Sequence, residues 1–118
     1  MSESFKDLLV WQRAVQLALA VYRMTSWFPV SERFGQTNQM RRASVSVASN
    51  IAEGYGRSTT GEYRQFLGHA RGSNCELETQ LVISHGLGFG AGPARQEVEG
   101  LCGEVSRMLV AILKKLEN

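Results

Sequence analysis

Proline and cysteine are scarce in this sequence. Of its 118 residues only two are proline (Pro29 and Pro93) and two are cysteine (Cys75 and Cys102). The cysteines have no CxxC spacing and no accompanying histidine cluster, which argues against a zinc site and against a disulfide framework. Because each lies among apolar residues, where a free thiol behaves as a small hydrophobic group, we expect both to be buried.

The sequence also lacks a long apolar run of the kind that crosses a membrane or directs export. Its longest segment without a charged residue, 79–94, contains four glycines and Pro93, which are poor material for a membrane span. The apolar stretch near the N-terminus is interrupted by Lys6, Asp7 and Arg13, which breaks up any signal-peptide core. We therefore expect a cytoplasmic protein that makes no membrane contact.

Motifs for catalysis and for cofactor binding are absent. There is no GxSxG nucleophile motif, no P-loop, no GxGxxG after a strand and no HExxH. The two histidines, His69 and His85, would lie about 24 Å apart on one helix, too far to share a metal ion. No Glu-x-x-His pair occurs, although the di-metal sites of helical bundles use one. We expect a protein that acts without catalytic residues, cofactor or metal.

Helical periodicity, in contrast, is present over almost the whole length. Apolar residues recur every three or four positions in four segments, and no segment has the alternation of a β-strand. Pro29 ends the first segment, a capping box at Thr59–Glu62 opens the third, and Pro93 opens the fourth. The pattern predicts helices at about 4–26, 37–55, 60–86 and 93–117.

Four helices joined by short loops are expected to pack as antiparallel neighbours. We therefore predict an all-α fold, an antiparallel up-and-down four-helix bundle, with residues 1–118 forming one domain. The connector 29–35 is expected to be a tight turn closed by Gly35, with Phe34 packed into the core.

The first two predicted helices carry more apolar surface than one bundle needs. A bundle helix requires an apolar stripe about 100° wide, and these two helices exceed it. The surplus predicts a homo-oligomer that buries part of both helices. The alternative is a well-filled monomer whose alanine and serine positions tolerate solvent. The expected interface residues are Leu8, Trp11, Val15, Val45 and Ala52.

Positive charge is concentrated in the middle of the chain. Residues 33–71 contain six arginines, no lysine and only two glutamates, whereas the whole chain has a net charge of +2. Arginine favours planar, bidentate partners such as phosphate or carboxylate. The candidates for nucleic-acid contact are Arg41, Arg57, Arg64 and Arg71. The competing interpretation is a solvated helix face held by salt bridges.

A set of polar side chains lies close to the predicted apolar stripes of the second and third helices. Buried polar side chains must be paired, so these residues are expected to form a structural network. In that network Glu53 or Glu76 would accept hydrogen bonds from Arg42 and Asn50, and fix the register of the two helices. A solvated position for Glu76 is the alternative. The members of the proposed network are Arg42, Asn50, Glu53, Ser73 and Glu76.

Several motifs together resemble one protein family. They are spread over residues 5–14, 28–35 (FPVSERFG), 39–43 (QMRRA), 49–54 (SNIAEG) and 72–79 (GSNCELET). In this order and spacing they resemble the four-helix-bundle proteins encoded by intervening sequences in bacterial 23S ribosomal RNA genes. The similarity covers nearly the whole chain.

The same family includes the accessory variability protein of diversity-generating retroelements, a pentameric bundle that binds a reverse transcriptase and nucleic acid through a basic surface. The resemblance therefore implies a bundle, suggests a pentamer and implies no enzyme activity. Two functions follow as hypotheses. The first is a homo-oligomeric accessory protein that binds RNA or DNA. The second is a protein interaction scaffold whose arginines contact carboxylates of a partner such as a reverse transcriptase.

Overall fold

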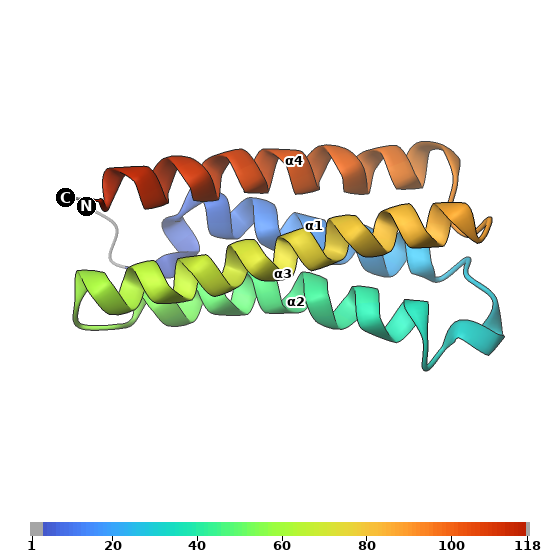
Figure 1. Cartoon of the computed structure of the whole chain (residues 1–118), viewed down its shortest axis with the longest axis horizontal. Coiled ribbons are helices and arrows are strands. Elements are labelled where there is room, and N and C mark those ends of the chain that lie inside the picture. Colours follow the sequence, from blue (N-terminus) through green and yellow to red (C-terminus); the bar gives the residue numbers. More distant parts are fainter. Residues whose placement is uncertain (1–3, 118) are drawn as a thin grey trace.

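The computed structural model describes residues 4–117, so positions 1–3 and 118 of the expected domain lie outside the described residues. Four α-helices and two short 3-10 helices make up the described chain (Figure 1). No helix in this part of the chain is long and apolar enough to cross a membrane. In chain order the elements are η1 (Phe5–Asp7), α1 (Leu9–Thr25), η2 (Val30–Glu32), α2 (Gln36–Tyr55), α3 (Thr60–Gly86) and α4 (Gly92–Lys115).

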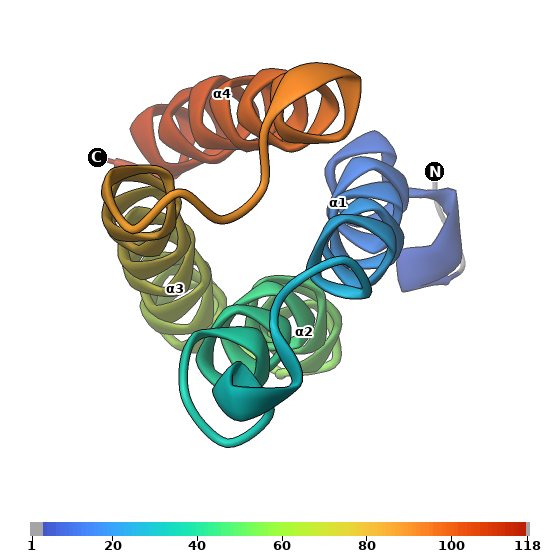
Figure 2. The ribbon, with the colours of Figure 1, turned by 90° about the vertical axis from the view of Figure 1, so that its right-hand side faces the viewer.

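Helices that follow each other in the chain also lie side by side. α1 packs on α2 and α4, and α3 packs on the same two helices. Seen end-on, the four helices stand in chain order around a common centre (Figure 2). The bundle is a rod of 44 × 22 × 22 Å. The all-α up-and-down bundle expected from the sequence is confirmed.

One stripe of each helix supplies the core. On α1 the stripe is Val10, Ala14, Leu17 and Val21, at the spacing of three or four residues that keeps side chains on one helical face. Full burial of a side chain the size of Leu or Met contributes about 1.5–3 kcal/mol. The largest fully buried side chains include Leu17, Met24, Met40, Ile51, Leu67, Leu77 and Leu109.

The first helix starts later than the sequence pattern predicts. Ser4 caps the short η1 helix by accepting a hydrogen bond from the backbone N–H of Lys6. Leu8 is then extended (φ −75°, ψ 125°), and the α-helix begins at Leu9. The helical apolar spacing continues through the break, which is why periodicity alone places the start near residue 4.

The connector between α1 and α2 places Phe34 differently from the prediction. Phe34 is 85% exposed, whereas Phe28 is buried. The ring of Phe28 packs against Phe89 from the α3–α4 connector, with centroids 5.7 Å apart. Phe28 therefore fills the end of the core, and Phe34 is left outside with the Arg33 guanidinium over its ring.

Two glycines are required where elements approach closely. A Cβ at Gly54 would lie 2.7 Å from the Cβ of Phe66, so only glycine lets the end of α2 pack against the start of α3. Gly90 has a φ of +69°, and a Cβ there would lie 2.9 Å from the Phe28 ring. At the predicted capping box, the Thr59 hydroxyl accepts from the backbone N–H of Glu62 at 3.1 Å and lies 3.1 Å from Glu62 Oε1, so Thr59 caps α3 as expected.

Candidate functional site

A shallow apolar groove runs along the outer seam between α1 and α2. Its volume is about 430 Å³. The α1 residues Trp11, Val15, Ala18 and Tyr22 flank the buried stripe at spacings of three and four, which continues the apolar face beyond what the core covers. We call this feature the α1–α2 groove; it is lined by Trp11, Val15, Ala18, Leu19, Tyr22, Val45, Ala48, Ser49 and Ala52.

The groove contains most of the residues predicted to form an oligomer interface. Trp11, Val15, Val45 and Ala52 line it together, and Val45 is 43% exposed. Leu8 does not line it. Instead, Leu8 borders a separate hollow between α1 and α4 with neighbours that include Met108 and Ile112. The lining also includes residues outside the predicted set, among them Ala18 and Tyr22, which extend the same spacing on α1.

The seam between α1 and α4 is built differently. Two ion pairs cross it, Arg13 to Glu104 at 2.6 Å and Arg23 to Glu97 at 3.1 Å. Within residues 4–117 no ion pair crosses the α1–α2 seam. The two seams therefore differ in that ion pairs join α1 to α4, whereas the α1–α2 seam contains the apolar groove and no ion pair among the described residues.

Arg41 is held against α1 and is not free on the surface. Its Nε donates to Thr25 Oγ1 at 2.9 Å and its Nη2 donates to the Tyr22 carbonyl oxygen at 3.4 Å. The guanidinium also lies over the Tyr22 ring, 4.5 Å from the centroid. These contacts fix the side chain near one end of the α1–α2 groove.

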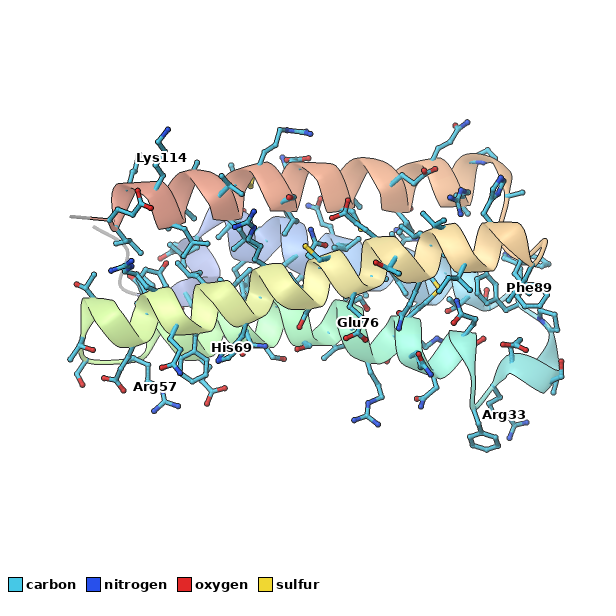
Figure 3. All side chains as sticks on the ribbon, in the orientation of Figure 1. Arg33, Arg57, His69, Glu76, Phe89 and Lys114 are labelled. Carbon is cyan, nitrogen blue, oxygen red and sulfur yellow. The ribbon has the colours of Figure 1, made fainter. Side chains whose placement is uncertain are left out.

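Arg57 lies in the connector that follows the other end of α2, and it already has a carboxylate partner. Its Nη2 is 2.9 Å from Glu53 Oε1, and its guanidinium lies over the Phe66 ring. In Figure 3 its side chain projects outward from the α2–α3 end of the bundle. Both groups of this pair are substantially exposed, so the ion pair contributes little to stability.

Arg64 and Arg71 are the two predicted arginines without a partner among the described residues. Both are exposed on α3, and their separation of seven residues places them on one helical face. Glu78, seven residues beyond Arg71 and so on the same face of α3, lines a hollow between α3 and α4 with Arg95 and Glu99. Arg64 and Arg71 therefore lie toward the α4 side, away from Arg41. The four predicted arginines do not form a single patch on one chain.

The predicted ionic network between α2 and α3 is not what the structure contains. Asn50 Nδ2 donates to the carbonyl oxygen and the hydroxyl of Ser46, and the Ser46 hydroxyl lies 2.9 Å from that of Ser73. Glu53 pairs with Arg57 instead of receiving hydrogen bonds from Asn50.

The other two proposed members of the network lie at the surface. Arg42 is exposed on α2, and Glu76 is exposed on α3, where it accepts a hydrogen bond from Gln80 Nε2. Figure 3 shows Glu76 on the outside of the α2–α3 layer. The link between the two helices at this level is thus made by two neutral hydroxyl groups, because small serines face each other there.

Two buried amides join the helices at positions that the sequence pattern does not single out. Gln80 Nε2 also donates to Gln39 Oε1 at 3.2 Å, and the carbonyl oxygen of Gln80 accepts from Gln36 Nε2. Asn74 Nδ2 donates to the carbonyl oxygen of Cys102 at 3.0 Å and so ties α3 to α4. Burial of Asn74 could have been predicted from its position in the apolar stripe of α3, between Ala70 and Leu77.

The two cysteines differ in exposure. Cys102 is buried as expected, and its pKa is raised to about 12 by desolvation, then by the nearby charges of Glu78 and Glu99. Cys75 is exposed, which contradicts the expectation that both thiols are buried. Within the described part of the chain no three His, Cys, Asp or Glu side chains form a group that could hold a metal ion.

The chain is similar to known proteins in both sequence and fold. A family model described as 23S rRNA-intervening sequence protein matches residues 6–111. A crystal structure of a protein of unknown function, from the S23 ribosomal protein family of Bacteroides thetaiotaomicron, has a TM-score of 0.82 and 18% sequence identity. The likeness covers 90% of this chain and 99% of that chain, and at this identity it shows a shared fold alone. No functionally curated protein matches the sequence.

The family match extends over most of the chain and includes every motif that suggested the resemblance apart from the first residue of the earliest one. The resemblance expected from those motifs is therefore confirmed. The chain belongs to the 23S rRNA-intervening sequence protein family.

Proposed function

We propose that the protein is a homo-oligomeric accessory protein that binds RNA or DNA through its surface arginines and acts without catalysis. The observation that carries the proposal is the pair Arg64 and Arg71, which are exposed on one face of α3 and have no partner among residues 4–117. An unpaired guanidinium keeps its planar set of donors available for a phosphate.

Self-association is the second part of the proposal, because one chain presents its arginines on different sides. Repetition of Arg64 and Arg71 around a symmetry axis would multiply the cations that a single nucleic acid can engage. The α1–α2 groove supplies an apolar surface for such packing. A ring of five copies is the arrangement that the resemblance suggests.

The oligomeric state is tested with a substitution inside the groove. We expect the wild type to elute in size-exclusion chromatography with light scattering at a multiple of 13.1 kDa. Val45→Asp would place a charge in the groove and yield a monomer, while folding is retained because Val45 is 43% exposed. Val110→Asp is the matched control, since Val110 on α4 is 40% exposed and lies outside the groove. A monomeric wild type at micromolar concentration would overturn the self-association.

Nucleic-acid binding is tested by fluorescence anisotropy with structured RNA and duplex DNA at several salt concentrations. We expect binding at low salt that weakens steeply as salt rises. The double variant Arg64→Ala, Arg71→Ala should weaken binding. It should also reduce the slope of log K against log[salt] by about 0.9 for each phosphate that is no longer neutralised. Arg107→Ala controls for the removal of positive charge, because Arg107 is exposed on α4 and forms no ion pair within residues 4–117. Binding that is unaffected by the double variant would refute the role of these arginines.

The α1–α2 groove also supports a second candidate function, a protein interaction scaffold. An apolar groove between two helices fits the apolar face of an amphipathic helix from another protein. A reverse transcriptase is the partner class that the resemblance suggests. A complex with a co-expressed reverse transcriptase that survives nuclease and high salt, and is abolished in Val45→Asp, would favour this function over nucleic-acid binding.

A further inference from the structure

A second hollow lies next to the α1–α2 groove and has a different chemistry. Its volume is about 520 Å³, and it shares Tyr22 and Val45 with the groove. It contains two arginines and no acidic residue. We call it the arginine hollow; it is lined by Tyr22, Asn38, Arg41, Arg42, Val45 and Ser46.

Arg41 is oriented in this hollow before any ligand arrives. Thr25, which is buried, accepts from Arg41 Nε and in turn donates to the Val21 carbonyl oxygen at 2.8 Å. Together with the stacking on Tyr22, these bonds fix the plane of the guanidinium. Arginine has five N–H donors, and the contacts with Thr25 and Tyr22 use two of them. The remaining donors have no acceptor among the described residues. A ligand can therefore accept hydrogen bonds from them without the entropic cost of ordering the Arg41 side chain.

Arg42 adds a second positive charge that is not neutralised within residues 4–117. It is exposed and has no carboxylate within salt-bridge distance. Glu53, the only acid on α2, is eleven residues further along, about 17 Å away on the helix axis, and pairs with Arg57. Asn38 supplies an amide that can also donate, and it is exposed at the rim. The hollow therefore combines two adjacent guanidinium groups with the Asn38 amide, and no carboxylate lines it. Such an environment is suited to an oxyanion.

We infer that the arginine hollow is a binding site for a phosphate group, with Arg41 as the preoriented donor and the exposed Arg42 as the second one. Resting on the proposed function, the group is a phosphodiester of a bound RNA or DNA. Phosphate suits the site because it offers several oxygens to donors. Asn38, Arg41 and Arg42 follow one another on α2 at spacings of three and one, which places them on one face of the helix, where their donors can reach a common anion. The shared Tyr22 and Val45 place this phosphate at the edge of the surface proposed for self-association.

The first experiment uses inorganic phosphate as the probe and does not depend on nucleic-acid binding. The ¹⁵N-labelled protein is titrated with phosphate and followed by two-dimensional NMR, with acetate as a separate titration at matched ionic strength. We expect saturable shifts at Asn38, Arg41 and Arg42 with phosphate, and these shifts should disappear in Arg42→Ala. Arg107→Ala, which removes an equivalent exposed charge from α4, should leave them unchanged. No saturable shift in the wild type, or equal shifts in Arg42→Ala, would overturn the site. A response to acetate but not to phosphate would overturn it in favour of a carboxylate on a partner protein.

The second experiment connects the site to nucleic acid. Arg42→Ala should weaken binding of structured RNA by about tenfold at low salt, the usual effect of removing a charge-assisted hydrogen bond. Arg42→Lys, which keeps the charge but not the planar pair of donors, should recover only part of that affinity. If phosphate binds as expected but no nucleic acid does, the site stands and the proposed function fails. If nucleic acid binds and Arg42→Ala behaves like Arg107→Ala, the phosphodiester assignment fails and the proposed function stands.

Discussion

The two cysteines differ in exposure because Cys102 is on the core-facing side of α4 and Cys75 is on the outer side of α3. Cys102 belongs to the core stripe of α4, whereas Cys75 lies beside the buried Asn74 and faces outward. A thiol reagent such as dithionitrobenzoate should therefore modify Cys75 rapidly and Cys102 only as the chain unfolds. A reaction that stops at one thiol per chain would confirm this, and Cys75→Ser should remove the fast phase. Rapid modification of both thiols in the folded protein would contradict it.

Burial of Cys102 also predicts how stability depends on pH. Its pKa is raised from 9.0 to about 12 by desolvation and by the charges of Glu78 and Glu99. Below pH 9 the thiol is neutral in both states, so its contribution to stability is fully present. Between about pH 9 and 12 the unfolded chain has given up the proton that the folded chain retains, so stability falls as pH rises.

The measurement compares the free energy of unfolding of the wild type and Cys102→Ala by chemical denaturation across this pH range. The variant should be less stable at neutral pH because a cavity is left, yet its stability should decline less steeply above pH 9. Parallel curves for the two proteins would show that the thiol does not contribute to the decline.

At the level of helices, the contact of α2 with α3 depends on Gly54. Gly54→Ala would bring its Cβ to 2.7 Å from the Phe66 Cβ, so the two helices must separate or shift. We expect a decrease of about 1–3 kcal/mol in the free energy of unfolding, as for other overpacked sites. Gly68→Ala is the control, because a Cβ at that position of α3 meets nothing within 4 Å. The control should gain up to about 1 kcal/mol from helix propensity, and destabilisation of both variants alike would contradict the packing argument.

The sequence was most informative where structure depends on local residues. The starts of α3 and α4 lie within one residue of the predicted positions, since the N-cap Thr59 and Pro93 act on the chain near them. The break at Leu8 and the exposure of Phe34 could not be read from periodicity, because both depend on packing at the ends of the bundle. Phe28 and Phe34 are equally apolar, and only the contact of Phe28 with Phe89 distinguishes them.

The candidate site was predicted in part for a related reason. The surplus apolar face of α1 and α2 follows from spacing within each helix, so Trp11, Val15, Val45 and Ala52 were found. Which polar side chains meet between helices depends on the rotation of one helix against the next. Periodicity fixes that rotation too loosely to separate Ser46 and Ser73, which meet, from Arg42 and Glu76, which do not.

For the whole molecule, self-association through the α1–α2 groove predicts a change around Trp11. Trp11 lines the groove, and its ring packs edge to face on Phe5 with centroids 5.2 Å apart. The other tryptophan, Trp27, is 86% exposed, so Trp27→Phe leaves Trp11 as a single reporter with little effect on folding. Covering of the groove by a second copy removes water from around the Trp11 indole.

We therefore expect the fluorescence of the Trp27→Phe protein to shift to longer wavelength on dilution, with the midpoint that light scattering gives for dissociation. Mass action also requires the melting temperature to rise with protein concentration. With Val45→Asp added, the emission should stay at the long wavelength and the melting temperature should not depend on concentration. If the mass changes with dilution while the Trp11 emission does not, the copies associate through a surface other than the α1–α2 groove.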